Sequence, residues 1–262
     1  MFLVFNKQKI YAYIVSVFTV LTLFASAVVL QNNTNVQVIR TASTTEKLLP
    51  IYNVKTEEKK IAFTINCAWN ADDIDNIIKT LEENNTKITF FMVGEWIDKY
   101  PEAAKKISDS GHEIASHSNT HPHVNSLNYE ENIAEIEKSN DKIEKITGTR
   151  TKIYRAPYGE YNNTVIKAAN DKGYYTIQWN LDTLDYTGLS GEEMWNRLNG
   201  KLKEGDIILS HNGTKYTAES LDMLIKNIKK AGFEIVRISD LIYKDNYSIN
   251  SNGTQIAKWI KL

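Results

Sequence analysis

Histidine is concentrated in one short stretch of the sequence, Gly111 to His123, which reads GHEIASHSNTHPH and holds four of the five histidines. His117 and His121 are four residues apart, so a helical turn after Ser116 would place both imidazoles on one face. Two imidazoles placed in this way could bind one metal ion. The alternative is a polar surface turn in which the histidines occur by chance.

The sequence around this stretch alternates between strand-like and helix-like patterns from Lys60 onward. Strands are expected at 61–65, 87–93, 113–115, 152–154, 174–181, 206–211 and 233–236, and helices at 71–84, 96–107, 128–146, 163–172, from 190, and at 217–231. About seven such alternations predict a parallel sheet. A closed or nearly closed (β/α) barrel fits best, and an open doubly wound sheet is the alternative.

Unusual polar residues gather where these strands end. They are Asn66 and Cys67 after the first strand, His117 and His121 after the third, Arg155 after the fourth, Asp182 and Asp185 after the fifth, and His211 after the sixth. The carboxyl ends of parallel strands share one edge of such a fold. We therefore expect one site there, and its histidines favour a metal site.

The first thirty residues differ from the rest of the chain. Lys7 and Lys9 precede a charge-free run from Ile10 to Leu30. About 20 apolar residues suffice to span a bilayer. The basic N-terminal flank predicts that the folded part of the chain after this run, here called the body, lies outside the cytoplasm. We expect a single-pass membrane anchor in residues 1–30, or a secreted protein if the small residues 25–27 are cleaved as a signal sequence.

Composition divides the remainder of the chain. Residues 31–57 are rich in Asn, Thr and Ser and are expected to form a stem, 58–244 a single domain, and 245–262 a C-terminal tail.

A net charge of −1 gives no attraction to nucleic acid. The single cysteine, Cys67, excludes an intrachain disulfide. We expect a monomer.

Four of the ordered motifs carry a family resemblance. They are His117-Ser118-Asn119-Thr120-His121, Arg155-Ala156-Pro157-Tyr158, Asp182-Thr183-Leu184-Asp185-Tyr186 and Leu209-Ser210-His211. With them, the stretch from Lys60 to about Lys244 resembles the polysaccharide deacetylases, also called the NodB-homology domain or carbohydrate esterase family four. The resemblance implies a distorted (β/α) barrel. It also implies metal-dependent hydrolysis of the carbon–nitrogen amide bond in N-acetylated sugars of peptidoglycan or chitin.

The resemblance also implies roles for individual residues. His211 would donate a proton to the leaving amine, Asp185 would orient that imidazole, and Arg155 would hold the general base. The backbone N–H of Tyr158 would stabilise the oxyanion. Leu209, Tyr186, which stands where the family usually has Trp, and Trp69 would contact the sugar.

The first motif departs from the family pattern. The family reads Thr-Phe-Asp-Asp-Gly, whereas residues 64–68 read Thr-Ile-Asn-Cys-Ala. Asn66 stands where the family has its base, and an amide cannot take a proton near neutral pH. Cys67 stands where the family has its third metal ligand, and as a thiolate it would complete a zinc site with the two histidines. Alternatively, Cys67 is a small buried residue.

Two functions follow from these residues. The first, which we favour from the sequence, is a metal-dependent deacetylase of cell-wall glycan anchored outside the cytoplasm. Zinc is the expected metal, and Asp72, Asp73 or Glu160 is the expected substitute base. The second is an inactive, membrane-anchored relative that binds glycan during envelope or spore assembly. Asn66 and Cys67 are the residues that separate the two.

Overall fold

A computed structural model describes residues 7–33 and 47–258, and the chain divides into two compact units, residues 1–46 and 47–262. In the first unit, α1 (Lys7–Asn33) is the helix that the charge-free run predicts. The expectation that this helix crosses a membrane is not supported: among the residues described, no helix is both long enough and apolar enough to span a bilayer.

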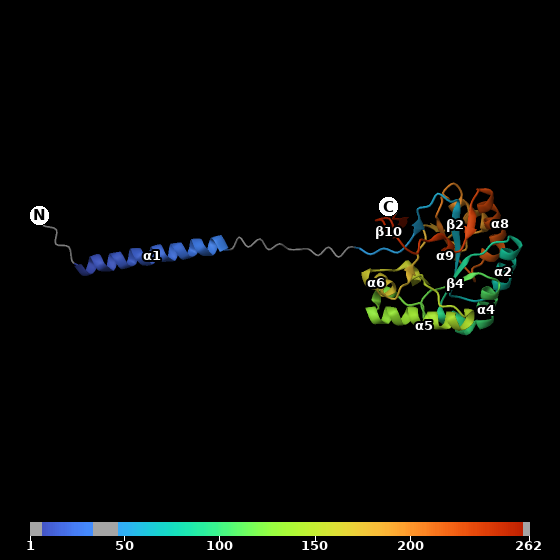
Figure 1. Cartoon of the computed structure of the whole chain (residues 1–262), viewed down its shortest axis with the longest axis horizontal. Coiled ribbons are helices and arrows are strands. Elements are labelled where there is room, and N and C mark those ends of the chain that lie inside the picture. The colour runs from blue at the N-terminus through green and yellow to red at the C-terminus, as the bar shows by residue number, and fades with distance from the viewer. Residues whose placement is uncertain (1–6, 34–46, 259–262) are drawn as a thin grey trace. The chain divides into compact units, whose positions relative to one another are not determined.

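The second unit is built on a curled parallel sheet (Figure 1). In sheet order the strands are β6 (Tyr175–Thr176), β5 (Ile153–Tyr154), β4 (Glu113–Ser116), β3 (Thr89–Met92), β2 (Lys60–Cys67), β8 (Ile207–His211) and β7 (Leu181–Asp182). A further strand, β9 (Glu234–Val236), pairs with the start of β2. All of these pairs are parallel, which confirms the expected α/β barrel class in the form of a half-barrel.

Helices cover the outside of this sheet (Figure 1). They are α2 (Ile74–Glu83), α3 (Gly94–Lys99), α4 (Pro101–Asp109), α5 (Tyr129–Thr147), α6 (Asn163–Asp171), α7 (Gly191–Leu198) and α8 (Thr217–Lys230), with 3₁₀ turns at Val124–Ser126, Pro157–Gly159 and Asp185–Thr187. The short helix α9 (Ile238–Leu241) packs instead with Ala62 and Ala115 on the inner face of the sheet. Capping boxes begin α5 at Asn128 and α7 at Ser190. The helix expected at 96–107 is two helices, because Pro101 lacks an N–H and therefore begins a new first turn.

The open side of the half-barrel is bridged by residues from the expected stem. Ile51 forms a parallel bridge with Ile177, next to β6, and Asn53 forms an antiparallel bridge with Asp206, next to β8. The N–H of Val54 donates to the carbonyl of Gly205 at 2.9 Å. A Cβ at Gly205 would lie 1.7 Å from the Val54 carbonyl oxygen, so only glycine fits there. Residues 51–54 therefore belong to the body.

Two other expectations differ from the structure. The strand expected at 174–181 is two short strands, β6 and β7, because the chain crosses between them from one edge of the sheet to the other. The expected tail contains β10 (Tyr247–Ile249) and β11 (Thr254–Ala257), which form a small sheet with β1 (Asn53–Val54) in the order β1-β11-β10. The C-terminal segment is therefore part of the folded body as well.

Strand β2 is buried on both faces, and its alternation decides which residues face the site. Ile65 and Cys67 pack in the large apolar cluster between the sheet and the outer helices. Thr64 and Asn66 point to the opposite face because successive side chains of a strand alternate; both bond to Arg155 there. The sequence neighbours Asn66 and Cys67 thus lie on different sides of the sheet.

Candidate active site

A hollow of about 390 Å³ opens at the carboxyl ends of the strands. Its lining residues are Asn66, Trp69, His117, His121, Tyr158, Gly159, Trp179, Asp182, Tyr186, Leu209 and His211. The register of the parallel pair β2–β8 places Asn66 directly opposite His211. The structure therefore brings together most of the residues that the sequence assigns to the site. Arg155 and Asp185 lie directly behind Asn66 and His211.

The two histidines of the central stretch converge, but not through a helix. After β4 the chain makes a tight turn in which Ser118 (φ 65°) and His121 (φ 58°) are left-handed. The Ser118 hydroxyl accepts a hydrogen bond from the N–H of His121 at 3.1 Å, which stabilises this turn. The imidazole centroids of His117 and His121 are 4.9 Å apart. The predicted helical turn is wrong, whereas the predicted proximity is correct.

Asn66, Arg155 and His117 form a closed circuit of hydrogen bonds at the wall of the pocket. The Nη1 of Arg155 donates to Oδ1 of Asn66 at 2.9 Å. The Nδ2 of Asn66 lies 3.3 Å from Nε2 of His117. The Nδ1 of His117 lies 2.9 Å from the backbone carbonyl oxygen of Arg155 and donates to it. The side chains of Asn66 and His117 are thereby each fixed by contacts with the other two residues, through the guanidinium of Arg155 for Asn66 and through its backbone carbonyl for His117.

Arg155 is fully buried, and its guanidinium has only neutral hydrogen-bond partners among the residues that the structure describes. It donates to the hydroxyl of Thr64, to Asn66 and to the backbone carbonyls of Ile177 and Gln178. Its carbon Cζ lies 3.8 Å from the centroid of the Phe91 ring. Burial lowers the pKa of Arg155 well below its ordinary value, and the charge of Asp182 opposes this shift. Arg155 therefore holds an amide where the family has a carboxylate.

The pKa values of His117 and His121 are both lowered, which favours the neutral form of each imidazole. Burial lowers the pKa of His117 well below its ordinary value, and the neighbouring His121 adds to the shift. Burial also lowers the pKa of His121. Neutral imidazoles are the form that binds metal ions or accepts hydrogen bonds.

His211 and Asp185 form the second polar pair of the site. The Nδ1 of His211 lies 2.9 Å from Oδ1 of Asp185. The other carboxylate oxygen accepts from the hydroxyls of Ser210 and Thr217, each at 2.7 Å, and from the N–H of His211 at 2.6 Å. Burial alone would raise the pKa of Asp185, but these hydrogen bonds, above all the one from His211, place it below its ordinary value. The carboxylate therefore stays charged and orients the imidazole.

Aromatic side chains form the walls of the pocket. The ring of Trp69 lies 5.3 Å from that of His211, and the ring of Tyr186 lies 5.4 Å away on a nearly perpendicular plane. Tyr158 packs edge-on against His121 and stacks on His123 at 4.3 Å. Trp69, Tyr158 and Tyr186 are each about half exposed, at 48%, 58% and 50%. Exposed rings of this kind are suited to stacking against sugars.

Two lining residues are absent from the predicted site, Gly159 and Trp179, and a third, Asp182, was expected at this edge of the sheet but was given no role of its own. Asp182 is the one carboxylate among the lining residues of the described pocket, and burial raises its pKa. The signal for it was present, because Asp182 ends the fifth predicted strand in the same motif as Asp185. Trp179 carried no comparable signal, since an aromatic residue in a strand is more often part of the core.

The three carboxylates considered as substitute bases do not line the pocket. Asp73 accepts a hydrogen bond from the N–H of Gly213 at 2.7 Å, and Glu160 lies 2.7 Å from Nδ1 of His123. Asp72 is also outside the lining. The structure therefore supplies none of these three in place of Asn66.

The donors at the site do not make a family-type metal centre. Cys67 is fully buried in the apolar cluster behind β2, and burial raises the pKa of its thiol, with the charge of Asp73 adding to the shift. His117 and His121 would be two ligands, but Nε2 of His117 already faces the amide of Asn66. Across the described part of the chain, no three His, Cys, Asp or Glu side chains are grouped so as to hold a metal ion. Zinc binding stays a prediction that this geometry does not support.

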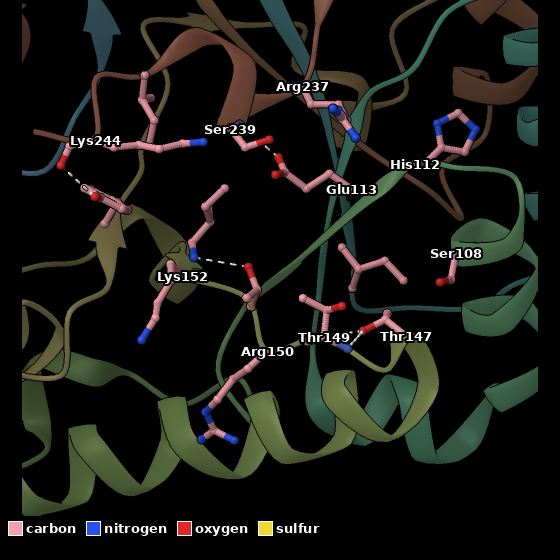
Figure 2. A pocket seen from close by; sticks show the side chains of 15 residues that line it. Ser108, His112, Glu113, Thr147, Thr149, Arg150, Lys152, Arg237, Ser239 and Lys244 are labelled. Atoms are coloured by element: carbon pink, nitrogen blue, oxygen red, sulfur yellow. Dashed lines mark hydrogen bonds between the residues drawn. The ribbon is translucent and has the colours of Figure 1, made fainter.

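A larger hollow of about 600 Å³ lies at the other ends of β4, β5 and β6 (Figure 2). Its cationic lining residues include Arg150, which is paired with carboxylates of α5, and Arg237, which is paired with Asp240. The carboxylate of Glu113 accepts from the N–H of Ser239 at 3.2 Å. The charges of Arg150 and Arg237 are therefore compensated within the protein, whereas Lys152 and Lys244 are further cationic residues of this lining.

Comparison with known proteins agrees with the fold and the site. The family model for polysaccharide deacetylase matches residues 53–177. The peptidoglycan-N-acetylglucosamine deacetylase of Bacillus cereus is 28% identical over 200 residues, which are 75% of this chain and 73% of that protein. The uncharacterized protein YlxY of Bacillus subtilis is 33% identical over 193 residues, and the match covers 74% of this chain but only 60% of that protein.

A solved structure shows the same similarity. A family 4 carbohydrate esterase pseudoenzyme from Bacillus anthracis superimposes with a TM-score of 0.71 at 32% identity, over 74% of this chain and 69% of that one. A mutant of that pseudoenzyme has restored enzymatic activity and matches equally well, with a TM-score of 0.71. The chain belongs to the polysaccharide deacetylase family. That family contains both peptidoglycan deacetylases and pseudoenzymes.

Proposed function

We propose that the body binds an N-acetylated glycan of the peptidoglycan type in the pocket and that the native chain does not hydrolyse it. The observation that carries this proposal is the position of Asn66. Its amide stands in the place of the family's base and is held there by Arg155 at 2.9 Å. Membership of a family with both deacetylases and pseudoenzymes supports the choice of ligand.

Hydrolysis of an acetamide needs a group that activates water as well as a group that protonates the amine. An asparagine amide cannot accept a proton near neutral pH, and a general base is worth about 10²–10⁴ in rate. Cys67 does not reach the pocket to serve as a metal ligand. The half of the site that would activate water is therefore missing.

The half of the site that would bind a sugar is complete. Exposed rings of Trp69 and Tyr186 flank His211, so a sugar ring can stack between the walls. The carboxylate of Asp182 lines the pocket and can accept hydrogen bonds from sugar hydroxyls. Leu209 provides an apolar surface for the acetyl methyl group. Because such glycans lie outside the cytoplasm, we propose that the body works there.

Slow deacetylation is the second candidate function. It is favoured by one observation, the intact pair of His211 and Asp185, which glycan binding alone does not require. In this case His211 would still protonate the leaving amine.

The experiment uses the purified full-length chain and peptidoglycan oligomers. Calorimetry should show binding of N-acetylated oligomers, weaker binding of the same oligomers after chemical de-N-acetylation, and weaker binding by Trp69→Ala. Acetate in the same samples should stay at the level of the buffer control. Equal affinity for both oligomers would overturn the assignment of the ligand. Acetate release by the wild type that is lost in His211→Ala would establish the second candidate instead.

A further inference from the structure

We infer that Asn66 is a built-in cap on the metal-binding nitrogen of His117, so that the native pocket is closed to divalent cations by a hydrogen-bonded amide. This goes beyond the proposed function because it concerns a cation and not the glycan. It rests on the circuit that joins Asn66, Arg155 and His117.

The orientation of the Asn66 amide follows from the chemistry of its partner. A guanidinium group donates hydrogen bonds and accepts none. The Asn66 atom that lies 2.9 Å from Nη1 of Arg155 must therefore be the oxygen. The amide nitrogen, with its two hydrogens, is then the atom that faces His117.

The tautomer of His117 follows in the same way. The backbone carbonyl of Arg155 can only accept, so Nδ1 of His117, at 2.9 Å, carries the hydrogen. In the neutral imidazole Nε2 then holds the lone pair. This lone pair is the one that a metal ion would need, and the amide of Asn66 lies 3.3 Å from it.

The circuit is held from outside as well. Arg155, Asn66 and His117 are 0%, 4% and 3% exposed, so water cannot easily replace a broken bond within it. The hydroxyl of Thr64 accepts from Nη1 of Arg155 at 2.9 Å and donates to the carbonyl of Ile208 at 2.6 Å. Rotation of the amide would remove the acceptor from one N–H of the buried guanidinium and the donor from Nε2 of the buried imidazole, which costs free energy.

A carboxylate at this position would have the opposite effect. An aspartate could accept from Arg155 with one oxygen and would present its second oxygen to Nε2 of His117. Two acceptors that face each other favour a cation between them. One atom type at residue 66 therefore decides whether the position next to His117 is closed or open to a cation.

The experiment titrates zinc, and separately cobalt, into the full-length chain and follows heat and the cobalt absorbance. Asn66→Ala removes the cap without adding a charge and should bind zinc about tenfold more tightly than the wild type, the value of one buried hydrogen bond. Asn66→Asp should bind more tightly still. The double variant Asn66→Asp, His117→Ala is the matched control and should return to the wild-type level.

Nitrogen-15 NMR of the imidazoles gives a measurement that needs no variant. In the wild type, Nε2 of His117 should have the chemical shift of a hydrogen-bonded, unprotonated nitrogen and should not move when zinc is added. A wild-type chain that binds zinc as tightly as Asn66→Ala, or whose His117 Nε2 shifts on zinc addition, would overturn the inference. Because the readout is metal binding, this failure is distinct from a failure to bind glycan.

Discussion

The imidazole of His211 lies 2.9 Å from the carboxylate of Asp185. The second oxygen of this carboxylate accepts hydrogen bonds from other protein groups. The hydroxyls of Ser210 and Thr217 both point their hydrogens at the same oxygen. These donors tie β8, the start of α8 and the 3₁₀ turn Asp185–Thr187 to one charge. Asp185 is therefore as important for the structure of this edge of the barrel as for the orientation of His211.

Asp185→Asn should lower the free energy of unfolding by about 2–3 kcal/mol, because an amide brings two hydrogens into a site already filled with donors and leaves buried groups unpaired. Urea unfolding measures the change. Asp182→Asn is the control, since this half-buried side chain keeps its acceptor for the N–H of Leu184, and it should cost less than about 1 kcal/mol. Equal losses in the two variants would contradict the structural role of Asp185.

Asp182 should matter instead for the glycan. Replacing it by asparagine turns a charge-assisted hydrogen bond to a sugar hydroxyl into a neutral one, a loss of about 1 kcal/mol, or about fivefold in affinity. Calorimetry with N-acetylated oligomers measures this loss. Glu160→Gln removes a carboxylate outside the pocket lining and should leave the affinity unchanged. If Asp182→Asn binds as tightly as the wild type, the carboxylate does not contact the sugar.

Asn66→Asp should give the chain measurable deacetylase activity in buffer that contains zinc. The substitution places a carboxylate beside Arg155 and opposite His211, where the family has its base. A general base contributes about 10²–10⁴ in rate, so even a partial gain is visible in an acetate assay. Adding His211→Ala to this variant should remove the gain, because the leaving amine then has no proton donor.

Cys67→Asp should not help in the same way. Cys67 packs in the apolar cluster behind β2 and does not line the pocket. A carboxylate there is buried without a partner, and we expect a loss of about 2–4 kcal/mol of stability. Cys67→Ala is the control that keeps the site small and apolar, and it should cost less. A stable Cys67→Asp variant with tight zinc binding would show that the thiol position reaches the metal site.

The convergence of the polar residues was predictable, because carboxyl ends of parallel strands meet whatever the details of the helices between them. Asn66, His117, Tyr158 and His211 all reach one pocket for this reason. The face of the sheet to which the Cys67 side chain points could also have been predicted. If β2 is a regular strand as far as Cys67, the side chains of Asn66 and Cys67 must point to opposite faces of the sheet. The family motif instead implied that both side chains reach the site.

Other features had no signal in the sequence. The turn between His117 and His121 needs left-handed backbone at Ser118 and His121, which residues other than glycine adopt only when tertiary contacts hold them there. The bridge that Ile51 makes to Ile177 depends on a partner more than a hundred residues away. Local patterns of hydrophobicity do not contain such information. The predicted start of the domain at residue 58 therefore lies after residues 51–54, which pair with the folded body.

His112 gives a pH dependence that can be measured without any ligand. It is 6% exposed, its Nδ1 accepts a hydrogen bond from the N–H of Ile88 at 3.3 Å, and its Nε2 has no partner among the described residues. Burial, with a contribution from the charge of Lys87, lowers the pKa of His112 from 6.5 to about 4. Between these two pH values His112 therefore binds a proton in the unfolded chain but not in the folded protein.

Stability should thus fall as the pH falls from 6.5 to 4, because the unfolded state binds the extra proton in this range. At about 1.4 kcal/mol per pKa unit, the contribution of His112 reaches about 3 kcal/mol at pH 4. His112→Gln keeps an acceptor for Ile88 but cannot titrate, so its stability should depend less steeply on pH. His117 and His121 titrate in the same direction in both proteins, so the difference between the two urea-unfolding series isolates His112. Identical pH profiles from pH 7 to pH 4 would mean that His112 accepts its proton in the folded state and that the buried ring carries charge without cost.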